Sequence, residues 1–345
     1  MSSLPHHRPR PRATRASRLA GVAPRIAGRA TGLALGFAAD RLLGDPMRLH
    51  PVAGFGQLAQ RLESVTYADT RSRGLAHWVM LVSGCAAVGL AAERAGRGRP
   101  GTVAVTAAAT WLVLGGRSLE REACAVQTLL EADDLPGARH RIRSLVGRDP
   151  SRLDSGELAR AVIESVAENT SDAVVAPLVW GALAGVPGLL SYRAVNTLDA
   201  MIGHRTARYR RFGWASARLD DAANWLPARL AAALAVAGAP VVGGDPRVAG
   251  RVVRRDAARH PSPNAGQVEA AFAGALGVRL GGTNTYAGQV ESRGILGDGD
   301  QVTPRDIARS VRLARIVGLG ALLSAMGLTG LLGRSCRLPG HAPRR

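Results

Sequence analysis

The chain contains no lysine, and all 45 of its basic side chains are arginines, spread over 345 residues. A Walker-A phosphate loop of the usual type needs a lysine, so that way of binding a nucleotide is excluded. Schiff-base and lysyl-adenylate chemistry are excluded for the same reason, and no G-x-S-x-G nucleophile elbow occurs. If the protein uses a nucleotide, arginines, Mg²⁺ and helix N-termini must hold its phosphates.

Aromatic residues and cysteines are also scarce. Aromatics make up 4% of the chain, although its formal net charge is +19. A basic nucleic-acid-binding protein normally interleaves aromatic or polar readers with its arginines. Here long uncharged runs separate the arginines instead, so we expect no nucleic-acid partner. Cys85, Cys124 and Cys336 have no C-x-x-C spacing, which argues against a zinc cluster or a disulfide framework.

The most prominent feature of the sequence is a set of long apolar runs. They cover residues 75–92, 101–116, 173–192, 230–244 and 316–333. A membrane-spanning helix needs about 20 predominantly apolar residues, and five such runs are hard to place in a water-soluble core. The sequence therefore predicts an all-α, polytopic membrane protein with about five transmembrane helices and helical polar loops.

The runs also predict how the chain is divided and oriented. Residues 1–30 are expected to be a disordered basic extension, 31–333 one multi-pass membrane catalytic domain, and 334–345 a basic tail. Five crossings would place 31 of the arginines on one side, and the positive-inside rule makes that side of the cell membrane cytoplasmic. Residues 193–229 would then lie outside, unless Pro177 and Pro187 create a broken or re-entrant helix pair that keeps them inside.

Three carboxylates gather where the third apolar run begins. Their helix is predicted to start near Asp154, with Glu157 completing a capping box. A spacing of four places the carboxylates along one face, where they repel one another unless a cation lies among them. Oxygen ligands of this kind suit Mg²⁺ bridging to phosphates, although arginines such as Arg160 offer an alternative neutralisation. The three are Glu164, Glu168 and Asp172.

Polar groups near other runs point to a ligand site. Gly44-Asp45-Pro46 should stop a helix and leave Asp40 and Asp45 at a membrane surface, though a simple turn explains the triplet equally well. Paired glycines at 281–282 would let the backbone approach a ligand closely. The candidate ligand-binding residues are Arg193, Asn196, Arg205, Asp220, Asp221, Asn224, Asn264 and Asn284, with Asp199 as a further carboxylate.

At these segments the sequence resembles the cobalamin-biosynthesis CobD/CbiB family over roughly residues 31–333. The stretches that carry the resemblance are Gly44-Asp-Pro with His50-Pro-Val, residues 164–172, residues 194–201, Phe212-Gly-Trp through Asp220-Asp221, Asn224-Trp-Leu-Pro, and Ser262-Pro-Asn-Ala-Gly with residues 274–282. So many matches in the same order make chance an inadequate explanation.

The resemblance implies an adenosylcobinamide-phosphate synthase-like enzyme of the late corrin pathway. Such an enzyme uses ATP to join (R)-1-aminopropan-2-ol, or its phosphate, to the ring D propionate of (adenosyl)cobyric acid. Other late corrin-pathway enzymes are then expected partners at the membrane.

Roles for the candidate residues follow from this expected reaction. The three carboxylates would hold Mg²⁺ against the ATP phosphates, and Asp45 or Asp199 would accept the amine proton. Arg193 and Arg205 would bind the aminopropanol phosphate, and Asn196, Asn224 and Asn264 the peripheral amides of the corrin.

Two alternatives belong to other functional classes. A non-catalytic membrane sensor or scaffold similar to AmpE proteins would not need aligned carboxylates beside an asparagine-rich second site. A corrinoid transporter would place ionisable groups within its spans, whereas here they cluster mostly at span ends.

Overall fold

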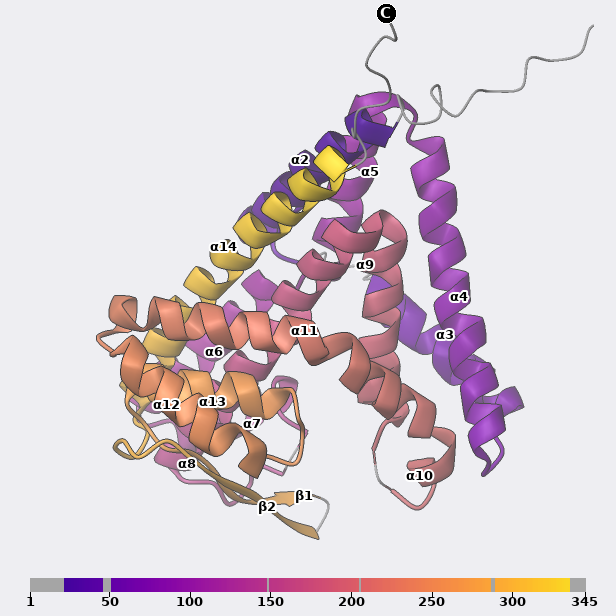
Figure 1. Ribbon diagram of the computed structural model, residues 1–345. Coiled ribbons are helices and arrows are strands. Elements are labelled where there is room, and N and C mark those ends of the chain that lie inside the picture. Colours follow the sequence, from indigo (N-terminus) through magenta and orange to yellow (C-terminus); the bar gives the residue numbers. More distant parts are fainter. Residues whose placement is uncertain (1–21, 46–50, 148, 205, 287–288, 336–345) are drawn as a thin grey trace, which may run out of the picture.

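The computed structural model describes residues 22–45, 51–147, 149–204, 206–286 and 289–335, and most of them are helical (Figure 1). A two-stranded antiparallel hairpin is the one sheet in these ranges. The α-helices and strands are α2 (Val22–Leu43), α3 (Pro51–Thr66), α4 (Arg71–Ala95), α5 (Gly98–Val113), α6 (Gly116–Glu131), α7 (Leu135–Arg141), α8 (Ser155–Thr170), α9 (Ala176–Ile202), α10 (Tyr209–Phe212), α11 (Trp214–Gly238), α12 (Pro246–Asp256), α13 (Ala265–Leu276), β1 (Leu280–Tyr286), β2 (Gln289–Leu296) and α14 (Pro304–Ser335). Short 3₁₀ segments occupy Ile142–Ser144, Ala239–Val242 and Ala257–Arg259, and a π-helix covers Ser171–Val175.

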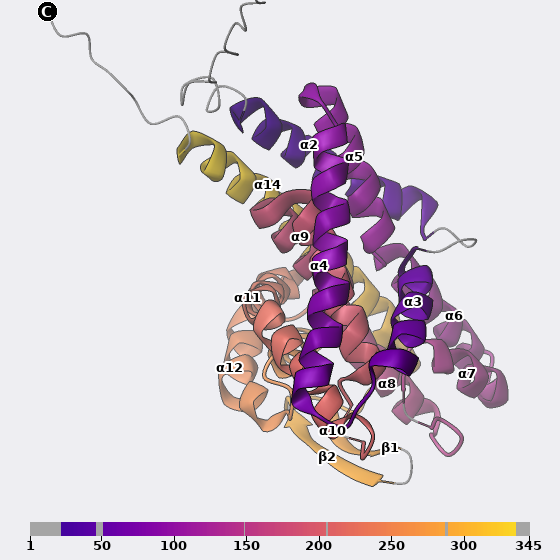
Figure 2. The ribbon, with the colours of Figure 1, turned by 90° about the vertical axis from the view of Figure 1, so that its right-hand side faces the viewer.

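The elements gather at two opposite ends of the molecule (Figures 1 and 2). The start of α2, the turn between α4 and α5 and the end of α14 lie together at one end. Helices α7, α8, α10, α12 and α13 and the β-hairpin lie at the other end, which we call the polar body. Long helices connect the two ends.

Five of these helices are long and apolar enough to cross a membrane, as the apolar runs predict. They extend over Arg71–Ala95, Gly98–Glu131, Ser155–Ile202, Trp214–Val242 and Pro304–Gly333. Four contain segments that run between the two ends, but α11 lies crosswise to α4 in both views (Figures 1 and 2). By length and composition α11 is a candidate span, but it does not run from one end of the molecule to the other as the other four do.

Helix α9 is two antiparallel arms. Gly185 has φ 69° and ψ −147°, which breaks the helix, and a Cβ at Gly181 would lie 2.9 Å from Leu189 Cδ2. In one continuous helix these residues would be about 12 Å apart along the axis. Glu93 at the end of α4 accepts the N–H of Val186 at 3.0 Å, so α4 holds the tip of the hairpin. The broken or re-entrant pair, which the sequence left open, is thus the arrangement that the structure has, with the break at Gly185.

This reversal decides which loops share a side. Asn196 donates to Asp172 at 3.4 Å, and Asn264 donates to the carbonyl of Asp221 at 2.8 Å. Residues 193–229 therefore lie with 117–172 and 245–315, and the five-crossing arrangement that separates them is wrong. Arg29 lies 3.6 Å from Glu93, so the start of α2 is at the end opposite the polar body rather than beside it. The physical reason is that α2 itself runs from one end to the other.

Glycines allow α2 to lie directly against α5. A Cβ at Gly32 would come within 2.5 Å of Thr106 Cβ, and one at Gly36 within 2.4 Å of Thr110 Cβ. Small residues spaced by four let two helix backbones approach closely in lipid, where packing rather than the hydrophobic effect holds helices together. Helix α2 begins at Val22, so it includes the end of the segment 1–30, and residues 1–21 lie outside the described part.

A buried carboxylate on α12 fixes the chain at the end of the β-hairpin. Asp256 at the end of α12 accepts the N–H of Gly297, directly after β2, at 2.9 Å. Arg255 donates to both oxygens of the same carboxylate, at 2.7 and 2.6 Å, and Arg259 lies 3.0 Å away. The hydrogen bonds from Arg255 hold the pKa of Asp256 below its usual range. A hairpin thus stands where helical polar loops were expected.

We expect Gly185→Ala to lower the stability of the detergent-solubilised protein by about 1–3 kcal/mol, because its backbone conformation is one that only glycine adopts freely. A Cβ there would also lie 2.1 Å from Glu93 Oε1. The measurement is the thermal unfolding midpoint. Gly84→Ala on α4, where a Cβ meets nothing within 4 Å, is the control and should not destabilise. Equal midpoints for Gly185→Ala and wild type would contradict the broken-helix geometry.

We expect Asp256→Asn to cost about 1–3 kcal/mol near neutral pH, because a buried hydrogen-bonded carboxylate loses its charge. A carboxylate with a lowered folded pKa stabilises above its unfolded pKa of about 4 and loses that contribution as the pH falls further. The difference in unfolding midpoint between wild type and variant should therefore shrink below about pH 4. Asp298→Asn is the control: Asp298 pairs with the same Arg255 at 2.5 Å but is exposed, so its effect should stay under about 1 kcal/mol. A difference that does not change with pH would show that the charge of Asp256 is not the source of the stabilisation.

Candidate functional site

The acidic residues of α8 and of the π-turn that follows it do not form one straight row. Asp154 caps the helix, and Glu157 completes the predicted capping box, with hydrogen bonds of 2.8 and 3.0 Å. From Ser171 the helix widens into a π-turn, a feature that is frequent at functional sites. The wider turn changes the direction in which Asp172 points, so the predicted straight row of carboxylates is interrupted.

The Glu164 carboxylate binds the backbone of the β-hairpin. It is buried, and its Oε1 accepts the N–H of Gly281 at 2.9 Å. Arg160 donates to the carbonyl of the same glycine and lies 3.9 Å from Glu164. The glycines at 281–282 therefore permit a close backbone approach, as predicted, but to a protein carboxylate and to the facing strand. The metal role predicted for Glu164 gains no support from these contacts.

Glu168 and Asp172 remain accessible. Glu168 is exposed and Asp172 partly exposed. Asp172 lies within electrostatic range of Glu168, Asp199 and Asp220. However, no three Asp, Glu, His or Cys side chains among the described residues come close enough together to hold a metal ion. The described residues therefore offer carboxylates within electrostatic range of one another without forming a complete metal cage.

The second arm of α9 links these carboxylates to α11. Asn196 on the second arm donates to Asp172 at 3.4 Å and also hydrogen-bonds Asp220 on α11. Asp199 follows Asn196 by three residues on the same arm and lies within electrostatic range of Asp220 and Asp221. Three segments far apart in the sequence thus meet through one asparagine.

A buried chain of hydrogen bonds fixes the carboxylate on α11. The Tyr192 hydroxyl donates to Asn224 Oδ1 at 2.8 Å, and Asn224 Nδ2 donates to Asp220 Oδ2 at 3.0 Å. Asn224 is 1% exposed, so it positions Asp220 and offers no group to a corrin amide, which corrects the role predicted for it. Sequence reasoning missed Tyr192. Its position immediately before Arg193, at the end of an apolar run, was the available signal.

Arg193 is one of the two arginines predicted to bind a phosphate, and it lies among the carboxylates. It is partly exposed and lies within electrostatic range of Asp45, Asp172 and Tyr192. An arginine among carboxylates can bind phosphate oxygens while the carboxylates hold the accompanying cation. Asp45, which follows the end of α2, is thereby brought to the edge of the same site.

The other predicted residues either lie at the edge of the carboxylate and amide cluster or outside the described residues. Asn264 is buried, donates to the carbonyl of Asp221 and accepts from Arg229 at 3.3 Å, so it ties α11 to the start of α13 and does not face a corrin amide. Arg205 and the side chain of Asn284 lie outside the described residues.

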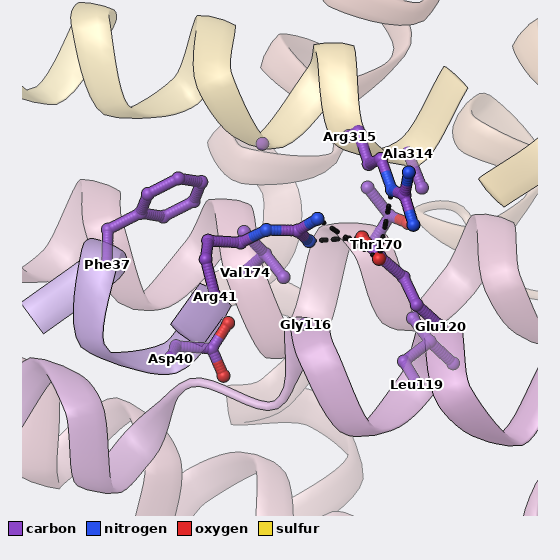
Figure 3. A pocket seen from close by; sticks show the side chains of 11 residues that line it. Phe37, Asp40, Arg41, Gly116, Leu119, Glu120, Thr170, Val174, Ala314 and Arg315 are labelled. Atoms are coloured by element: carbon purple, nitrogen blue, oxygen red, sulfur yellow. Dashed lines mark hydrogen bonds and ion pairs between the residues drawn. The ribbon is translucent and has the colours of Figure 1, made fainter. Parts of the chain in front are cut away.

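Asp40 is not at a membrane surface, contrary to the prediction. It is 0% exposed and faces Gly116 at the start of α6, where a Cβ would lie 3.1 Å from Asp40 Oδ2. Beside it Arg41 pairs with Glu120, and Arg315 of α14 donates to Glu120 Oε2 at 3.0 Å (Figure 3). These side chains line a small cavity between α2, α6 and α14. The Arg41–Glu120–Arg315 group gave no signal in the sequence because its members lie far apart in the chain.

Comparisons with known proteins show the family of the chain. The CobD/Cbib protein family matches residues 33–314. A cobalamin biosynthesis protein CobD of Mycobacterium tuberculosis is 54% identical over 300 residues, which cover 87% of this chain and 96% of that protein. The CobD proteins of Rhodobacter capsulatus and Chromobacterium violaceum are 43% and 44% identical, over 85% and 83% of this chain and 95% and 92% of theirs.

No solved structure matches the chain. The family match covers α8, both arms of α9 and α11, and so includes every described residue of the carboxylate and amide cluster. By this match and by its identity to these relatives, the chain belongs to the CobD/CbiB family of cobalamin-biosynthesis proteins.

Proposed function

We propose that the protein joins (R)-1-aminopropan-2-ol, or its phosphate, to the ring D propionate of (adenosyl)cobyric acid in an ATP-dependent amide-forming reaction. The product is (adenosyl)cobinamide (phosphate). The observation that carries the proposal is the convergence of Asp172, Asp199, Asp220 and Arg193 from three separate segments in a member of this family. Family membership supports the pathway, and the cluster supplies groups suited to phosphate transfer and proton removal.

The reaction needs an activated acid because a carboxylate does not react with an amine directly. A propionate oxygen attacks the γ-phosphorus of ATP, the bond from that phosphorus to its bridging oxygen breaks, and ADP leaves. The amine then attacks the acyl carbon, the bond from carbon to the phosphate oxygen breaks, and phosphate leaves. Asp199 or Asp45 takes the proton that the amine nitrogen loses.

The donor set fits Mg²⁺ that arrives with the nucleotide. Mg²⁺ commonly uses one or two protein carboxylates together with substrate phosphates. Glu168 and Asp172 are accessible carboxylates within electrostatic range of each other, and Asp172 is also within range of Arg193. The ion supplies charge neutralisation for the phosphates. Arg193 orients a phosphate, and Asn196 holds Asp172 and Asp220 in place.

We also propose that the polar body faces the cytoplasm at the cell membrane. The helices and the hairpin of the polar body hold ten of the described arginines, whereas the start of α2, the α4–α5 turn and the end of α14 together hold six. The positive-inside rule expects the richer end to be cytoplasmic. This orientation gives the site access to ATP, to its corrinoid substrate and to other late corrin-pathway enzymes.

We expect purified protein in detergent to form the amide and one ADP for each amide from adenosylcobyric acid, aminopropanol phosphate and Mg-ATP. Asp172→Asn and Glu168→Gln should lower turnover by at least about 10²-fold, because each removes a charge from the transfer site. Glu131→Gln, which changes an exposed carboxylate on α6, is the matched control. Absence of product from folded wild-type protein would favour the sensor, scaffold or transporter alternatives.

We expect Mg-ATP, but not Mg²⁺ alone, to raise the thermal unfolding midpoint, because the described residues provide no three-ligand site for the free ion. A ligand at 100 times its dissociation constant stabilises the folded state by about 2.7 kcal/mol. Asp172→Asn should reduce this shift. Equal stabilisation by millimolar Mg²⁺ alone would show instead that a complete metal site exists.

A further inference from the structure

An open groove with three arginines lies where α4 leaves the polar body. Its volume is about 670 Å³, and it is lined by Thr70, Arg71, Ser72, Arg210 and Arg211. All five residues are exposed. Asp69 lies 3.8 Å from Arg211 and offsets part of its charge, so the groove keeps a net positive charge. None of these residues belongs to the carboxylate and amide cluster.

The end of α10 is packed tightly against α4. A Cβ at Gly74 would lie 1.8 Å from the carbonyl oxygen of Phe212, so the two backbones meet only because position 74 is glycine. Phe212 is fully buried, and its ring lies 5.2 Å from that of Tyr67 and 5.3 Å from that of His77. This packing fixes the place of the two residues that directly precede Phe212.

Buried Glu63 on α3 ties down the other end of α10. It accepts hydrogen bonds from Arg208 at 2.8 Å and from the Tyr209 hydroxyl at 3.1 Å. Arg210 and Arg211 therefore project from a backbone that is anchored on both sides, which limits where their guanidinium groups can reach.

The groove opens at the level where α4 becomes apolar. Leu75 and Val79 follow Arg71 at intervals of four on one helix face, and both are exposed, as is Met80. Arg71 also stacks over Trp214, 5.1 Å from the ring centroid, and tryptophan is enriched at membrane interfaces. A ligand in the groove would thus have cations around its head and an exposed apolar stripe beside its tail.

We propose that this groove is a binding site for an anionic phospholipid. Arg71, Arg210 and Arg211 bind the phosphate, Thr70 and Ser72 offer hydroxyl groups to the rest of the headgroup, and an acyl chain lies along Leu75 and Val79. Arginine binds phosphate with charge-assisted, often bidentate hydrogen bonds. A free phosphate would use the arginines but not the apolar stripe, and this difference separates the two sources of phosphate.

The test compares bound lipid by native mass spectrometry of the full-length protein in detergent, titrated with phosphatidylglycerol or phosphatidylcholine of the same acyl chains. We expect wild type to retain phosphatidylglycerol selectively and Arg210→Gln/Arg211→Gln to bind it roughly 30-fold more weakly. Arg71→Gln is a second variant that leaves α10 unchanged. Arg97→Gln/Arg99→Gln, in the α4–α5 region at the opposite end, is the matched control and should bind as wild type does.

Three results would overturn the proposal. Equal retention of the two lipids would show that the headgroup charge is not recognised. Equal loss in the Arg97→Gln/Arg99→Gln control would show a non-specific effect of net charge. Displacement of phosphatidylglycerol by millimolar inorganic phosphate would assign the groove to a free anion. The unfolding midpoints of all variants establish that each one is folded.

Discussion

Glu93 accepts the N–H of Val186 at the tip of a helical hairpin whose turn at Gly185 has no room for a side chain. This turn sends the second arm of α9 back toward the polar body, and it returns Asn196 to the level of Asp172. A continuous helix over the same residues would carry Asn196 and Asp199 to the far end of the molecule. The site therefore depends on a contact made at the end opposite to it.

Amide side chains reduce the free-energy cost of bringing the acidic side chains together. Asn196 hydrogen-bonds Asp172 and Asp220, and Asn224 links Asp220 to Tyr192. Burying carboxylates without donors costs several kcal/mol per ion, so the amides stabilise a geometry that charge repulsion would otherwise open. Asparagine donates these hydrogen bonds without adding positive charge, which leaves the cluster negative and suited to a cation that enters with phosphates.

The arginines serve at least three separate places in the fold. Arg193 lies among the carboxylates, Arg255 and Arg259 fix Asp256 beneath the β-hairpin, and Arg71, Arg210 and Arg211 surround an open groove at the base of α4. Only the first position can serve the proposed chemistry directly. The high positive charge of the chain therefore reflects several local tasks rather than one basic surface.

The helical class, the five long apolar segments and the α8 capping box followed from the sequence alone, because they rest on local composition and on spacings of three or four residues. The same reasoning placed Asp172, Asn196 and Asp220 among the site residues from their motifs. It left the reversal at Gly185 open, missed Tyr192 and the π-turn, put Asp40 at a surface, and gave Glu164 and Asn224 roles that their protein contacts do not support. Apart from the π-turn, those features depend on contacts between residues far apart in the chain, and the hydrogen bonds of Asn196, Tyr192 and Glu164 join residues 24 to 117 positions apart. Local pattern carries no information about such distances, so only the packing of one helix against another decided them.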